Sequence, residues 1–330
     1  MNQIYVRGVG AVSPAGWGVP ALCQAVSNQK PLPFQPLDRP NSTHSFPVRR
    51  VPPPGLRPVF LSHPRLRRAS AISQFATAAA LEALGDSSGP VGVVFCTTCG
   101  SVNYSRRFYD DVLRDPVTAS PILFPETVFN APASHLASVL GSVSINYTLV
   151  GDSGVFLQGL ALAARWLEEG QVPACLVVAA EEGDWIIADV LQYFDRSARL
   201  AEGAGALLLS CERPADPAMS LTSVTDPDPF SDRRTRDEAL LRLSKTLAPL
   251  NSNELLFAES GGCWGDWGGT RMALEPTLGQ AFAASVAWQC VLASELAHPA
   301  RHSGAVIGVA GTYQEVIGAR FSLNYPTISP

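Results

Sequence analysis

Short apolar runs alternate along the chain with longer segments of helical periodicity. The runs VGVVFCTT (91–98), PACLVVAA (173–180) and GAGALLLSC (203–211) are apolar at nearly every position, so they predict strands buried on both faces. The segments 69–84 and 154–169 are rich in Ala and Leu, and each predicts a helix. Strands that alternate with helices indicate an α/β protein whose sheets are covered on both faces.

The remaining pattern repeats the alternation, more weakly after residue 212. Further strands are predicted at 3–12, 143–150, 219–225, 254–258, 304–310 and 315–323, and further helices at 18–28, 101–114, 131–140, 236–248 and 277–296. The proline-rich segment 30–66 has no helical period and predicts an irregular surface cap. Residues 226–237 are acidic, contain proline and predict a solvated loop.

Composition narrows the class of protein. The chain has 330 residues, 46% of them hydrophobic and 16% charged, which is enough for one large or two medium domains with buried cores. The formal net charge is −5 and no dense Lys/Arg stripe is present, which argues against nucleic-acid binding. The cluster Arg65, Arg67 and Arg68 fits the solvated start of a helix, or a contact with an acidic carrier protein.

The cysteines and the apolar segments bear on the compartment. Seven scattered cysteines in apolar contexts predict reduced, buried thiols. Cys96 and Cys99 form a CxxC motif without a second pair or a histidine, so no metal site is predicted, and the sequence indicates no other cofactor. No apolar run is long enough to span a bilayer, and we expect a cytoplasmic protein without membrane contact.

The segment SINYTLVGDSGVFLQG (144–159) is the principal candidate for a site. A strand runs into the turn Gly151-Asp152-Ser153-Gly154, and a helix follows directly. A strand, a sharp turn and a helix N-terminus together often hold a nucleophile or an anion. Ser153 is therefore a candidate nucleophile, but helix capping by Ser153 or Asp152 is the simpler interpretation.

Five strings, in order along the chain, resemble the β-ketoacyl synthase family. They are RGVGAVSPAGWG (7–18), SPILFPETVFNAPASHLASVLG (120–141), VVAAEEGD (177–184), LAEGAGALLLSCE (200–212) and IGVAGTY (307–313). The resemblance implies a thiolase-like fold of five layers, αβαβα, with two pseudo-repeated halves. We place the halves at residues 1–212 and 213–330, the second being shortened.

The family's chemistry uses a cysteine at the strand–turn–helix elbow, two histidines and a lysine, and this chain differs at each position. The nucleophile position falls on Gly151 or Asp152, or is deleted. Glu259 replaces the first histidine, Gln280 replaces the second, and Glu275 stands where the lysine would be. A carboxylate beside a developing oxyanion opposes the reaction, and a glutamine cannot transfer protons. The resemblance therefore implies a subunit that does not condense on its own.

Such a subunit is most like a chain-length factor of a type II polyketide or aryl-polyene synthase. The resemblance implies a heterodimer with an active ketosynthase, and contact with an acyl carrier protein through that complex. Strand 144–150 and residues Thr127, Val128, Phe129 and Asn130 would then lie near the dimer interface, with Phe129 in place of the family's proline. Phe129 either bounds the partner's acyl tunnel or simply packs in the interface.

Two other interpretations remain open. In the first, Ser153 or Asp152 acts with Glu259 in acyl transfer, thioester hydrolysis or decarboxylation. A serine nucleophile needs a histidine base, and His135 is the candidate nearest the turn by the resemblance. In the second, the chain forms a structural homodimer within a synthase complex.

Overall fold

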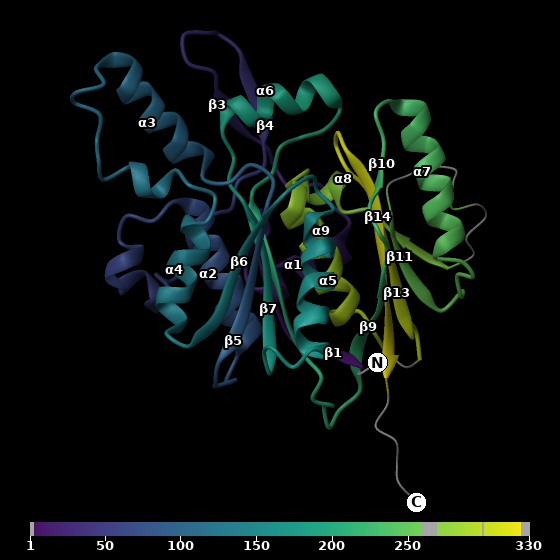
Figure 1. Ribbon diagram of the computed structural model, residues 1–330. Coiled ribbons are helices and arrows are strands. Elements are labelled where there is room, and N and C mark those ends of the chain that lie inside the picture. The colour runs from purple at the N-terminus through teal and green to yellow at the C-terminus, as the bar shows by residue number, and fades with distance from the viewer. Residues whose placement is uncertain (1–2, 259–263, 265–268, 299, 325–330) are drawn as a thin grey trace, which may run out of the picture.

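The computed structural model describes residues 3–258, 264, 269–298 and 300–324, and Figure 1 shows their arrangement. The strands are β1 (Ile4–Ser13), β2 (Gly16–Trp17), β3 (Gln35–Asp38), β4 (Ser45–Val48), β5 (Val91–Thr97), β6 (Val143–Val150), β7 (Ala174–Glu181), β8 (Gly203–Ser210), β9 (Ala218–Val224), β10 (Asp228–Pro229), β11 (Glu254–Ala258), β12 (Thr270–Met272), β13 (Gly304–Ala310) and β14 (Glu315–Asn324). The α-helices are α1 (Val19–Asn28), α2 (Ala71–Leu84), α3 (Val102–Arg114), α4 (Ala131–Leu140), α5 (Val155–Glu168), α6 (Trp185–Phe194), α7 (Arg233–Thr246), α8 (Glu275–Leu278) and α9 (Phe282–Glu295). Three 3₁₀ turns are η1 (Val59–Ser62), η2 (Pro64–Leu66) and η3 (Phe124–Glu126).

The strands follow one pattern twice. The first half has the order β1-β8-β7-β5-β6 and the second half has the order β9-β14-β13-β11-β12. In each half the first two pairs of neighbours are antiparallel and the other two are parallel. The halves join where β1 pairs with β9, at Ile4 and Tyr5. The predicted pseudo-repeat is therefore confirmed.

Helices lie outside and between the two halves of the sheet. Helices α2 and α4 cover the outer face of the first half, and α7 covers that of the second (Figure 1). Helices α5 and α9 pack against each other and contact strands of both halves. These are the five predicted layers.

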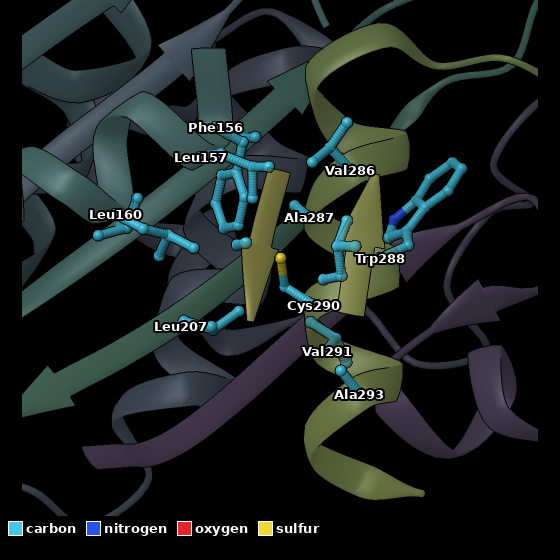
Figure 2. Packing of buried hydrophobic residues seen from close by; sticks show 14 of the residues in the cluster. Phe156, Leu157, Leu160, Leu207, Val286, Ala287, Trp288, Cys290, Val291 and Ala293 are labelled. Carbon is cyan, nitrogen blue, oxygen red and sulfur yellow. The ribbon is translucent and has the colours of Figure 1, made fainter. Parts of the chain in front are cut away.

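The central layer explains why α9 is apolar around nearly its whole circumference, whereas α5 buries one broad apolar face and leaves Arg165 and Glu168 exposed. Figure 2 shows Phe156, Leu157 and Leu160 of α5 facing α9 across the core. Trp288 of α9 is fully buried, and its indole N–H donates to the carbonyls of Val12 (3.0 Å) and Ala204 (2.9 Å). A helix buried between two sheets has no solvated face on which to place polar residues.

Three local expectations were wrong. The predicted irregular cap contains the hairpin β3–β4, which packs against α6, and α6 itself was not predicted. The helix predicted at 277–296 is two helices, because Gln280 leaves the helical path and pairs with the backbone at 199–201. The predicted loop 226–237 includes the start of α7, where Asp232 and Thr235 form a reciprocal cap.

Candidate functional site

The elbow lies where the parallel strands β5 and β6 end together. The amide of Gly151 donates to the carbonyl of Thr97 at 3.3 Å, directly after the last paired residues, Thr97 and Val150. α5 then begins at Val155. The strand–turn–helix geometry predicted from the sequence is therefore present.

Asp152 is buried in this elbow and its carboxylate is bound by backbone amides. Its Oδ1 accepts from the N–H groups of Ser153 (2.8 Å) and Thr312 (2.9 Å). Its Oδ2 accepts from the N–H groups of Tyr313 (3.1 Å) and Gln314 (2.9 Å). Residues 311–314 form the turn between β13 and β14, so this carboxylate connects the two halves of the protein.

The capping roles proposed for Asp152 and Ser153 are wrong. The N-cap of α5 is Gly154, and no side chain caps this helix. Asp152 is turned toward the 311–314 turn instead, where three further amides satisfy its charge. The hydroxyl of Ser153 is buried and has no hydrogen-bond partner among the residues that the structure describes.

Two of the residues that the sequence predicts at altered family positions lie beside the same turn. Glu275 and Gln280 line a hollow of about 550 Å³ together with residues 310–313. The side-chain oxygen of Gln280 accepts from the Phe282 amide at 2.9 Å, at the start of α9. Glu259 lies outside the described residues.

Two buried carboxyl groups, Glu181 and Glu182, lie at the end of β7, where the sequence favoured local hydrogen-bonding partners over a catalytic pair. Glu181 accepts from the Thr98 and Cys99 amides and from the Thr97 hydroxyl, yet its burial raises its pKa to about 8. Glu182 accepts from the Asn103 and Ile72 amides, and burial raises its pKa to about 7. Desolvation outweighs the hydrogen bonds in both. The local hydrogen bonds agree with that expectation, but the sequence did not predict the raised pKa values.

The thiol of Cys99 interacts electrostatically with Glu181 and Tyr313. Burial and then the charge of Glu181 raise the pKa of Cys99 well above its usual range. Tyr313 has its pKa raised to about 12, first by burial and then by Asp152, with Cys99 and Glu181 also contributing. A thiol whose pKa is raised by burial and a carboxylate is a poor nucleophile at neutral pH.

The segment from Thr127 to Asn130 lies on the surface, directly before α4. Val128 is 41% exposed and Phe129 is 45% exposed. The ring of Phe129 lies over Gly100, where an added Cβ would come within 2.5 Å of it. Gly100 follows β5, so Phe129 is held close to the carboxyl ends of β5 and β6.

His135 is hydrogen-bonded to Glu126. Both residues line a second hollow, separate from the one lined by Glu275 and Gln280. The Nε2 atom of His135 lies 2.8 Å from a carboxylate oxygen of Glu126. The hollow measures about 700 Å³, and its cationic lining consists of Arg65, Arg67, Arg68 and Arg107. All four arginines are exposed. His135 therefore belongs to this basic hollow, and no hydrogen bond in the described part of the chain joins it to Ser153.

Two features are absent from the described residues. No group of three or more His, Cys, Asp or Glu side chains there is arranged to hold a metal ion. None of the helices in those same ranges combines the length and apolarity needed to cross a membrane.

Comparison with known proteins gives the family and the fold. A model described as "Beta-ketoacyl synthase, N-terminal domain" matches residues 56–252. A comparison with curated proteins gave no match. Among solved structures, the ishigamide ketosynthase/chain length factor superposes with a TM-score of 0.79 and 19% identity, over 97% of this chain and 99% of that one.

Two further solved structures have the same fold. A type II polyketide acyl-carrier protein in complex with its ketosynthase (AntDE:AntF) gives a TM-score of 0.75 and 17% identity, over 97% of this chain and 99% of that one. The ketosynthase ApeO in complex with its chain length factor ApeC, from Xenorhabdus doucetiae, gives 0.70 and 14%, over 98% of both chains. The thiolase-like α/β fold expected from the sequence is thus confirmed.

Proposed function

This chain belongs to the β-ketoacyl synthase family, and from that premise we propose that it is a non-condensing subunit of the chain-length-factor type. It pairs with an active ketosynthase of a type II polyketide or aryl-polyene-type system and bounds the partner's acyl tunnel. The observation that carries the proposal is the elbow, which presents the buried Asp152 carboxylate and no thiol. A carboxylate held by amides is a weak nucleophile and repels a developing oxyanion.

Cys96, Cys99 and Ser153 do not restore the missing group. Cys96 is fully buried in β5 and Cys99 has a raised pKa, so neither supplies a thiolate at neutral pH. Ser153 lacks a base, since its hydroxyl has no partner in the described ranges and His135 is bound to Glu126. The interpretation of the chain as an enzyme of altered chemistry therefore has little support from the geometry.

The surface along β6 supports a partner subunit. β6 stands at one end of the strand order, and Tyr147 and Val150 on it are 54% and 51% exposed. Phe124, Val128 and Phe129 add exposed apolar side chains just before α4. An unpaired strand edge with exposed apolar residues favours association with another chain. We call these five residues the β6 face.

Coexpression tests the pairing. The chain is coexpressed with candidate ketosynthases, and any complex is purified through a tag on the ketosynthase. Tyr147→Asp and Val150→Asp should each reduce copurification at least about tenfold, because each places a charge in a buried apolar contact. Leu241→Asp is the matched control, since Leu241 is 46% exposed on α7, which covers the other half of the sheet.

Two results would contradict the proposed function. One is a homodimer that ignores the ketosynthase and whose Tyr147→Asp and Val150→Asp variants behave as the wild type. The other is condensation of malonyl units by the isolated chain.

Phe129 is the side chain that we assign to the tunnel boundary. Its ring is half-exposed and lies over Gly100, so its direction is set by packing rather than left free. Phe129→Ala should lengthen the products of the complex while leaving the complex assembled, whereas a packing role alone would weaken assembly without changing product length. Mass spectrometry of the products and gel filtration of the complex separate the two outcomes.

The basic hollow is the surface that we assign to the carrier protein. Four exposed arginines around one hollow attract an acidic partner, and such attraction weakens as salt is added. Arg68→Glu combined with Arg107→Glu should raise the Kd for the carrier protein about tenfold or more at low salt. Arg301→Glu, an exposed arginine of the second half, is the control and should leave Kd unchanged.

A further inference from the structure

We infer that residues 312–314 form an anion-binding site whose permanent occupant is the chain's own Asp152. The site is an internal latch that joins the elbow of the first half to the β13–β14 turn of the second. It also makes the amides of Ser153 and of residues 312–314 unavailable to any substrate oxygen. The inference does not depend on the partner subunit.

The donor set is the first support. Four backbone N–H groups, those of Ser153 and of residues 312–314, converge on one carboxylate at 2.8–3.1 Å. Successive backbone amides that point into one concavity make an anion site without any cationic side chain. No ion pair to Asp152 occurs among the described residues, so the amides are what hold its charge.

The shape of the turn is the second support. A Cβ added at Gly311 would lie 2.0 Å from Oδ2 of Asp152, so only glycine leaves room for the carboxylate. Asp152 itself is 1% exposed. The turn is therefore closed around a group of the size of a carboxylate, and solvent does not compete for the amides.

The consequence for chemistry follows from the same bonds. Stabilising a developing oxyanion requires amide donors that are free and aimed at the reacting oxygen. Here the donors beside the elbow already bind a full negative charge. The latch thus keeps these four amides from binding another anion. The elbow therefore lacks both a thiol and these amide donors.

Chemical rescue tests the inference with the full chain. Asp152→Ala removes the carboxylate and leaves its space empty, and the Tm should fall by roughly 4 °C or more. Sodium formate should enter the vacated site and restore at least half of that loss in a saturable way, relative to sodium chloride at equal ionic strength. The wild-type Tm should respond equally to the two salts.

Two variants serve as controls. Asp152→Asn fills the same space but brings an NH₂ group against amide donors, so its Tm should fall and formate should not restore it. Ser153→Ala changes the adjacent residue of the elbow, whose hydroxyl has no partner, and should keep a Tm near that of the wild type.

Three outcomes would overturn the inference: an Asp152→Ala protein as stable as the wild type, a loss that formate and chloride restore equally, or rapid amide exchange in the wild type. The last measurement covers the case in which the alanine variant does not fold. Hydrogen exchange of the peptide spanning residues 311–315 in the wild-type chain should be slow. Exchange as fast as that of the loop 115–122 would contradict the inference.

Discussion

Glu181 illustrates how a single buried residue sets the response of the protein to pH. Its carboxyl group has a folded-state pKa of about 8, and burial is the main cause. Below its ordinary pKa the group is protonated in both the folded and the unfolded chain. Between the ordinary and the folded pKa only the folded chain keeps the proton, so the unfolded state gains relative stability as pH rises. Glu182, with a pKa of about 7, acts in the same direction.

We therefore predict that the free energy of unfolding falls as pH rises from about 5 to about 8, by an amount on the order of a few kcal/mol. Above about pH 8 these two groups no longer change the free energy of unfolding as pH rises. Urea unfolding across this range measures the effect. Glu181→Gln should flatten the slope, most clearly above pH 7, whereas Glu168→Gln on the exposed face of α5 should not. A slope of the opposite sign would show that these carboxyl groups are ionised in the folded chain.

At this scale the sequence singled out residues that the structure brings together, but it did not predict what their side chains contact. It placed Gly151, Asp152, Glu275 and Gln280 at the altered positions, and the structure brings the last three to one turn of the second half. It assigned Asp152 to helix capping, since capping depends on neighbours in sequence. The actual partners lie 160 to 162 residues away, and no local pattern encodes them.

Among the elements, α9 is the one on which both halves of the protein depend. It packs between the halves, and its Trp288 side chain donates to carbonyls of β1 and β8. We predict that Trp288→Phe lowers the free energy of unfolding by about 2 kcal/mol, through two lost hydrogen bonds and a small cavity. Chemical denaturation of the two proteins measures the difference.

Trp185→Phe is the matched comparison for Trp288. The indole N–H of Trp185 in α6 is buried without a hydrogen-bond partner in the described part of the protein. Removing an unsatisfied donor should change stability little or increase it slightly. If both substitutions destabilise equally, ring volume accounts for the loss and the hydrogen bonds of Trp288 do not.

Strands were easier to predict than helix boundaries for a physical reason. Buried β5, β7 and β8 require apolar residues at every position, which is visible in any window of the sequence. The break between α8 and α9 was missed, since it is caused by backbone pairing of Gln280 with residues 199–201. The residues on both sides of that break favour a helix, so the sequence of 277–296 gives no local sign of it.

For the whole molecule, the repeat of strand order does not imply two independent units. α5 and α9 each contact strands of both halves, so separating the halves exposes the central core. We predict that residues 1–212 expressed alone aggregate or stay unfolded, as judged by solubility and circular dichroism. Coexpression of 1–212 with 213–330 should recover a folded complex. A soluble, cooperatively folding 1–212 fragment would argue for separable domains.

The exposed edge at β6 also has a consequence for the cell that makes this protein. Until a second chain covers it, an eight-residue strand with free backbone groups and exposed Tyr147 and Val150 is available to any other strand edge. Surplus copies would then be prone to self-association and proteolysis. If the proposed partner covers this edge, synthesis of the two chains in balanced amounts would limit that self-association.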